Sequence, residues 1–260
     1  MLRVDGCYSR LATTTCLFVD VMPSDLNANL AMVRARLERA AERSGRDPAS
    51  IRLLAVTKQV SADRIRALVA LGVRTVGENR VQEALRKQAE LADLDLDWHL
   101  IGHLQTNKVK QVVGAFDLIH GVDSVKLARE LDARAEASLA GSARQDVLLQ
   151  VNVGREASKS GFFPDDLPAA AAEILGCQHL NVRGLMTVAP YAADPESVRG
   201  VFRQLRELRD ACQRRAGDRT ELSELSMGMS HDFAVAIEEG ATIVRIGSAL
   251  FGRRPAITAI

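Results

Sequence analysis

Eight short apolar segments alternate with amphipathic stretches along most of this 260-residue chain. The apolar segments are 53–57, 73–76, 97–101, 117–122, 146–152, 182–188, 222–227 and 242–246, and the stretches with helical apolar spacing are 61–71, 80–92, 104–114, 124–139, 165–176, 195–215 and 231–239. Apolar strands that are separated by helices are typical of a parallel sheet covered on both faces. We therefore predict an α/β fold, a single closed (β/α)8 TIM barrel.

An open, doubly wound sheet is the alternative architecture, but no GxGxxG follows the first strand segment to form a dinucleotide crevice. A helix pattern precedes the first strand; it starts at Ser24 and ends near Gly45 and Pro48. Because no linker or break in composition follows, we expect one barrel domain over residues 24–260 with this additional N-terminal helix.

Residues 1–23 are expected to form a poorly ordered extension. Charged residues interrupt the apolar centre that a signal peptide needs, and no small-residue cleavage pattern follows a hydrophobic run. Met22 stands just before the helix-start signal. We therefore hypothesise that residues 1–21 reflect the choice of start site.

The charge balance excludes several classes of partner. Lys and Arg number 34 and Asp and Glu 33, so the net charge of +1 gives no reason to expect binding to nucleic acid or to an anionic membrane. No apolar stretch approaches the roughly 20 residues of a membrane helix. Arg199, Arg203, Arg206 and Arg209 alternate with acidic residues and predict a solvated helix face.

Cysteine and histidine spacing points away from metal sites. The four cysteines are scattered without a CxxC, which fits a reducing compartment, and we expect a cytoplasmic protein. His99, His103 and His120 form no HxH or HExxH pattern, so we expect structural histidines and no metal. The sequence does not show the oligomeric state, and we take a monomer as the expectation.

Lys58 closes the first apolar strand in a chain with only six lysines against 28 arginines. Burial among apolar strands favours the neutral amine, and a neutral lysine amine captures aldehydes as Schiff bases. The alternative is an ordinary strand-end lysine whose head reaches solvent. Position alone does not decide between the two interpretations.

Two segments near the end of the chain suit a phosphate group. Gly247 and Ser248 open a short helical turn and offer backbone N–H groups and a hydroxyl. The segment from Ser226 to Ser230 could complete the cradle, because Gly228 allows close approach of the backbone. The alternative is that these glycines only make tight turns.

Arg245 interrupts the last apolar strand, and its fixed charge must find an acceptor inside the barrel. One candidate is Glu78, which would give a structural ion pair. The other is a ring nitrogen of a bound heterocycle. A guanidinium would donate to a pyridine nitrogen and keep it unprotonated, which weakens the ring as an electron sink.

The chain resembles the YggS/PROSC family of pyridoxal 5′-phosphate (PLP) homeostasis proteins over roughly residues 24–254. The segments that carry the resemblance are LLAVTK (53–58), VGEN (76–79) with VQE (81–83), WHLIGHLQTNK (98–108), LLQVNVGREASKSGF (148–162), RGLM (183–186), and LSMGMSHDF (225–233) with AIEEGATIVRIGSALFG (236–252). The pairing of SMGMS with VRIGSALFG is highly specific. The resemblance implies a barrel like that of alanine racemase and the other fold-type III enzymes.

The resemblance also implies the cofactor, PLP, and roles for particular residues. Lys58 would form the Schiff base, Asn79 would line the ring, and Arg245 would face the pyridine nitrogen. The full set of expected cofactor-binding residues is Lys58, Asn79, Met186, Ser226, Met229, Ser230, Arg245, Gly247 and Ser248, of which Ser226, Gly247 and Ser248 would hold the phosphate. Lys108 and Lys159 are secondary candidates that could receive or pass on the cofactor.

Two functions remain open at this point. A racemase needs a base on each face of the cofactor adduct, and in the related racemases an appended domain supplies the second base, a tyrosine. This chain has only Tyr8 and Tyr191, neither in such a domain. We therefore favour a non-catalytic protein that holds PLP and influences its supply, with apo-enzymes that need PLP as possible recipients. A fold-type III amino-acid racemase is the alternative.

Overall fold

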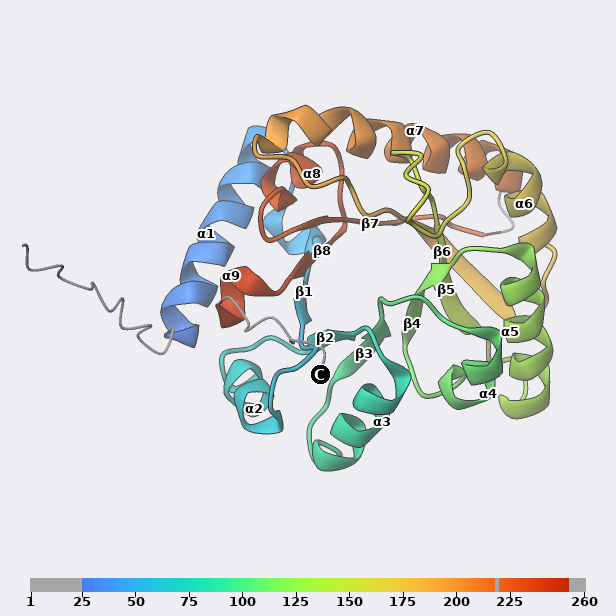
Figure 1. The fold of residues 1–260 in the computed structure, drawn as a ribbon, viewed down its shortest axis with the longest axis horizontal. Coiled ribbons are helices and arrows are strands. Elements are labelled where there is room, and N and C mark those ends of the chain that lie inside the picture. Colours follow the sequence, from blue (N-terminus) through green and yellow to red (C-terminus); the bar gives the residue numbers. More distant parts are fainter. Residues whose placement is uncertain (1–24, 218–219, 253–260) are drawn as a thin grey trace, which may run out of the picture.

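Eight parallel strands close into a barrel in sequence order, so that the first strand pairs with the last (Figure 1). The computed structural model describes residues 25–217 and 220–252. The strands are β1 (Arg52–Val56), β2 (Thr75–Glu78), β3 (Asp97–Leu100), β4 (Leu118–Val122), β5 (Gln145–Gln150), β6 (Leu180–Met186), β7 (Glu224–Met229) and β8 (Ile243–Ile246). The predicted TIM barrel is confirmed. The expected extension, residues 1–23, and the alternative start at Met22 lie outside the described residues.

Helices form the outer layer around this barrel (Figure 1). They are α1 (Leu26–Arg43), α2 (Ala62–Ala70), α3 (Val81–Glu90), α4 (Val109–Val112), α5 (Val125–Ser138), α6 (Leu167–Ile174), α7 (Arg199–Ala216), α8 (Phe233–Glu238) and α9 (Ser248–Phe251), with 3-10 turns at Pro48–Ser50, Thr106–Lys108 and Pro195–Val198. The additional helix α1 begins after Asp25, whose side chain accepts a hydrogen bond from the N–H of Asn27. It packs beside α8 and α9. None of the described helices is both long and apolar enough to cross a bilayer.

Several elements begin or end up to a few residues away from the prediction, and two of these differences have a clear cause. The second strand occupies Thr75–Glu78 rather than 73–76, because Gly72 makes a turn with a positive φ of 86° and pairing with β3 starts at Thr75. The helix expected over 104–114 shortens to a 3-10 turn and the four-residue α4, and Gly114 with φ 77° ends it. Gly77 and Glu78 therefore belong to β2 rather than to the loop after it.

Alternation along the strands separates the barrel interior from the layer under the helices. Leu54 and Val56 of β1 belong to an apolar cluster with Leu118, Leu148, Met186 and Ile243, which come from strands all around the barrel. Their neighbour Ala55 packs instead with the helices in the main core. Lys58 lies in the turn that follows the C-terminal end of β1, two residues after Val56.

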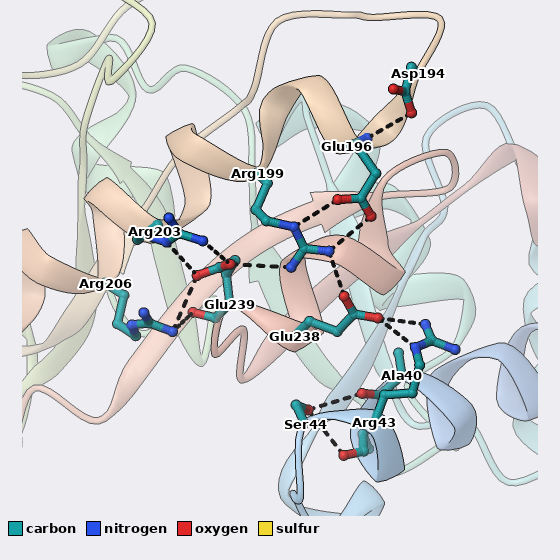
Figure 2. A network of polar contacts seen from close by, with 11 residues as sticks. Ala40, Arg43, Ser44, Asp194, Glu196, Arg199, Arg203, Arg206, Glu238 and Glu239 are labelled. Atoms are coloured by element: carbon teal, nitrogen blue, oxygen red, sulfur yellow. Dashed lines mark hydrogen bonds and ion pairs between the residues drawn. The ribbon is translucent and has the colours of Figure 1, made fainter.

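An ion-pair network joins α7 to α8 and α1 (Figure 2). Arg199 contacts Glu238 at 2.6 Å and Glu239 at 3.2 Å, and Arg43 of α1 contacts Glu238 at 2.6 Å. Arg203 and Arg206 also contact Glu239. The predicted solvated face holds for Arg203, whose side chain keeps 52% of its surface exposed, whereas Arg199 and Arg206 are half-buried because acidic residues at the C-terminal end of α8 meet them across the helix interface.

Candidate functional site

Lys58 is an exposed residue at the C-terminal end of β1, and no hydrogen bond or ion pair joins its side chain to another described residue. Of the two interpretations that the sequence left open, the structure shows a lysine that reaches solvent rather than one buried among apolar strands. β1 pairs with β2 on one side and β8 on the other. Lys58 therefore lies between the ends of the strands that carry Asn79 and Arg245.

Arg245 is 4% exposed and points to two neutral acceptors. It donates to Ser226 Oγ at 2.7 Å and to the carbonyl of Thr187 at 2.8 Å. Glu78, the partner considered from the sequence, instead binds Lys87 and Thr57 through Oε1. The Glu78 prediction was thus wrong, because Glu78 faces α3 and Arg245 faces the barrel interior. Burial lowers the pKa of Arg245 to about 10, so the guanidinium stays protonated at neutral pH.

Two buried histidines continue the contacts of Arg245 through the barrel. Ser226 Oγ lies 2.9 Å from His120 Nδ1, and His120 Nε2 lies 3.0 Å from His99 Nδ1. Burial lowers the pKa of His99 to about 3 and that of His120 well below its usual value. Both rings are therefore neutral at physiological pH. Because Arg245 donates to Ser226 Oγ, the serine hydroxyl donates its own hydrogen to His120 Nδ1, and His120 in turn donates to His99.

This interior chain is the part of the site that sequence reasoning missed. His120 is not isolated on its strand, as the sequence suggested, but pairs with His99. The signal that could have revealed it is the placement of both histidines in the inward rows of their strands. The structure places Ser226 beneath Arg245, fully buried, whereas its expected role at the phosphate stays a prediction.

A compact turn forms where β7 and β8 end. Ser230 Oγ accepts hydrogen bonds from the N–H groups of Gly247 and Ala249, both at 3.2 Å. Gly228 has φ +90°, and a Cβ there would lie 2.6 Å from the Cβ of Ala236, so only glycine fits. Ser248 is exposed beside this turn. Backbone donors and hydroxyls therefore meet at the mouth, an arrangement that can hold an anion.

A cavity of about 240 Å³ opens at the same end of the barrel. Asn79 and Met186 line it together with His103 and Lys159. Lys159 already forms an ion pair with Glu156. The side chain of Met186 is buried. The structure thus brings two of the expected cofactor-binding residues, Asn79 and Met186, to one cavity.

The remaining expected residues lie at the edge of this region. Met229 ends β7 and is 38% exposed, and it is paired in register with Arg245. Lys108 is half-buried in a 3-10 turn after β3. Across residues 25–217 and 220–252, no three His, Cys, Asp or Glu side chains gather in a way that could hold a metal ion.

Residues 28–255 match the family described as Alanine racemase, N-terminal domain. A relative from Aquifex aeolicus (strain VF5), named Pyridoxal phosphate homeostasis protein, is 50% identical over 225 residues, which are 86% of this chain and 96% of the relative. The chain belongs to this family of pyridoxal phosphate homeostasis proteins. The resemblance seen in the sequence motifs is confirmed.

Solved structures agree with membership in the homeostasis-protein family. PipY of Synechococcus elongatus PCC7942, solved with PLP bound, is 40% identical with a TM-score of 0.76, covering 87% of this chain and 100% of that chain. Alanine racemase from Corynebacterium glutamicum is 16% identical with a TM-score of 0.65, covering 90% of this chain and 64% of that chain. At that identity the likeness to the racemase shows the shared barrel fold alone.

Proposed function

We propose that this chain binds PLP at the C-terminal mouth of its barrel, holds it as a Schiff base on Lys58, and serves PLP homeostasis without substantial turnover. The observation that carries the proposal is the exposed Lys58 amine, which has no partner among the described residues and lies between the strands of Asn79 and Arg245. The family relatives and the PLP-bound PipY structure support it.

The residues at the mouth fit the three reactive parts of PLP. Its aldehyde suits Lys58: Nζ forms a C=N bond to the aldehyde carbon, and the aldehyde oxygen leaves as water with the two amine protons. Its phosphate suits the turn of Ser230 and Gly247, where a phosphate oxygen would take the place of Ser230 Oγ as the acceptor of the backbone N–H groups. Its pyridine nitrogen suits Arg245, whose guanidinium is held in place by neutral acceptors only.

The same residues argue against efficient amino-acid chemistry. A donor from Arg245 keeps the pyridine nitrogen unprotonated and weakens the ring as an electron sink. Tyr191 is the one tyrosine among the described residues, and it is 87% exposed with its ring 5.7 Å from that of His231. It therefore lies outside the cavity, where it does not serve as the second base of a racemase.

Storage and release of PLP is the function that follows, with apo-enzymes as the proposed recipients. An exposed amine at an open mouth allows the bound aldehyde to exchange with solvent amines and with other proteins. The monomeric state and the cytoplasmic location expected from the sequence stay predictions.

Visible absorption of the purified protein with added PLP, followed by borohydride reduction and peptide mass mapping, tests this proposal. We expect a yellow band and a reduced adduct on the peptide that contains Lys58. Lys58→Ala should abolish both, whereas Lys110→Ala, which removes an exposed lysine of α4, should leave both unchanged. A colourless protein, or an adduct spread over several lysines, contradicts the proposal.

The turnover part is tested separately with D- and L-alanine and other amino acids. We expect no steady racemisation or transamination above that of free PLP. Turnover that disappears in Lys58→Ala would instead establish a fold-type III enzyme and overturn the non-catalytic part of the proposal.

A further inference from the structure

A buried ammonium on α3 holds the backbone just before Lys58. Lys87 is only 2% exposed, and its Nζ lies 2.7 Å from the carbonyl oxygen of Thr57, 2.7 Å from Glu78 Oε1 and 2.7 Å from Glu83 Oε1. An ammonium has three N–H donors, so all of them are used. The hydrogen bond to the Thr57 carbonyl fixes the residue that precedes Lys58.

The residue after Lys58 is held by the same cluster. The backbone N–H of Gln59 donates to Glu83 Oε1 at 2.6 Å, and Gln59 adopts a positive φ of 59°. This conformation is uncommon for a residue with a side chain and persists where the surroundings enforce it. The N–H of Val60 also donates to the Thr57 carbonyl at 2.9 Å. Both neighbours of Lys58 are therefore fixed, while its side chain has no described partner.

Burying the charges of this cluster costs free energy, so the cluster is a poor way to gain stability alone. Burial raises the pKa of Glu78 although Lys87 and Thr57 donate to it, and its Oε2 has no hydrogen-bond partner among the described residues. Burial also opposes ionisation of Glu83, but hydrogen bonds from Lys87 and from the Gln59 N–H outweigh it and lower its pKa. Replacing a buried ion pair with apolar residues is often neutral or stabilising, so stability alone does not account for it.

We propose that Lys87 and Glu83 are positioning residues that fix the backbone of Lys58, so that its free amine meets the aldehyde of PLP in a constant place. The proposal deepens the proposed function and rests on Lys58 being the Schiff-base lysine. Neither Lys87 nor Glu83 lines the cavity at the barrel mouth. They act through Thr57 and Gln59 and reduce the range of positions that the amine samples.

Paired ligands separate positioning from folding. PLP forms a bond to Lys58, whereas pyridoxamine 5′-phosphate shares its ring and phosphate but has no aldehyde. In Glu83→Ala we expect the preference for PLP over pyridoxamine 5′-phosphate to fall by about tenfold or more, since small misplacements of a reacting group cost this much. Affinity for pyridoxamine 5′-phosphate should change by less than about twofold, because Lys58 makes no bond to it.

Three further variants sharpen the test. Glu83→Gln keeps an oxygen for the Gln59 N–H and should restore most of the preference, whereas Lys87→Met should lose it. Arg86→Ala removes the exposed ion pair with Glu90 on the same helix and should behave as the wild-type protein. Borohydride should trap the adduct on Lys58 as fast in Arg86→Ala as in the wild-type protein, somewhat more slowly in Glu83→Gln, and most slowly in Glu83→Ala and Lys87→Met.

The positioning role is overturned if Glu83→Ala loses affinity for PLP and for pyridoxamine 5′-phosphate equally, or if its affinities do not change, even when the wild-type protein forms its adduct on Lys58. A wild-type protein that shows no PLP preference and no adduct on Lys58 overturns the proposed function, and the positioning role with it. If Lys87→Met fails to fold, Glu83→Ala and Glu83→Gln still decide.

Discussion

Two ion-pair clusters in this barrel have similar chemistry and opposite surroundings. The cluster of Lys87 with Glu78 and Glu83 is almost closed to solvent, since the Lys87 and Glu78 side chains are 2% and 0% exposed. The network of α7 with α8 and α1 (Figure 2) is open on its arginine side, because Arg43 and Arg203 keep 55% and 52% of their side-chain surface exposed, whereas the central carboxylate of Glu239 keeps 7%.

The difference shows what each cluster can do. Charges near water attract one another weakly and are screened by salt, so an exposed network adds small increments of stability between helices. Charges removed from water interact strongly but cost desolvation, and losing one partner leaves the other uncompensated. The open network therefore ties the outer layer together, whereas the closed cluster controls the geometry of one backbone segment.

Removing the central ammonium of the closed cluster should give the largest effect. We expect Lys87→Met to lower the free energy of unfolding by about 3–5 kcal/mol, because Glu78 then stays buried without its cation. Urea unfolding followed by circular dichroism measures this. The double variant Glu78→Gln/Lys87→Met should recover part of the lost stability. A loss below about 1 kcal/mol in Lys87→Met would show that the buried cluster contributes as little to the free energy of unfolding as the open network does.

Acid should weaken the open network at its central carboxylate. Partial burial opposes ionisation of Glu239, but hydrogen bonds from Arg203 and Arg199 outweigh it, so its pKa lies below the ordinary value. Because the folded pKa is lower than the unfolded one, the stabilisation is present above the unfolded pKa and is lost as the pH falls through the folded pKa. We expect Glu239→Gln to cost about 1 kcal/mol at pH 7 and less at pH 3, which lies below the ordinary pKa of a glutamate.

Urea unfolding at the two pH values measures the effect of Glu239→Gln. Glu42→Gln, which removes an exposed carboxylate of α1, serves as the control and should show no comparable difference. A cost for Glu239→Gln that is the same at pH 7 and pH 3 would mean that its charge does not stabilise the fold.

The smallest effect is expected for an arginine at the rim of the open network. Arg203 contacts Glu239 at 3.1 Å but is half exposed, so Arg203→Ala should cost at most about 1 kcal/mol. Addition of about 1 M sodium chloride should remove most of this difference, since charges at the surface are then screened within about 3 Å. The cost of Lys87→Met should change little in the same salt, and equal salt sensitivity of the two variants would contradict the contrast.

The sequence predicted the barrel because apolar segments and helical spacing are local properties. It also placed Lys58 and Gly247 at strand ends, where barrel chemistry gathers. The sequence did not predict which groups pair with the buried charges. Lys87 looks like a solvated helix residue next to Glu83, and only the packing of α3 against β1 and β2 shows that it is buried.

The contacts of Arg245 were likewise not predictable from the sequence. Its sequence position says that a charge lies inside the barrel, but its acceptors are Ser226 of β7 and Thr187 just after β6, which are 19 and 58 residues away in the chain. The pairing of His99 with His120 likewise depends on the inward rows of two strands. Motif spacing carries no information on such contacts, because they depend on how side chains from different strands pack inside the barrel.

Closure of the sheet through the pairing of β1 with β8 also sets when the mouth can exist during synthesis. Lys58 leaves the ribosome early, whereas Arg245 and Gly247 come almost at the end, and the long loop between them must close before the mouth exists. A growing chain therefore has no complete site until its last strand docks. With the proposed site, retention of PLP would therefore mark finished molecules and separate them from truncated or half-folded ones.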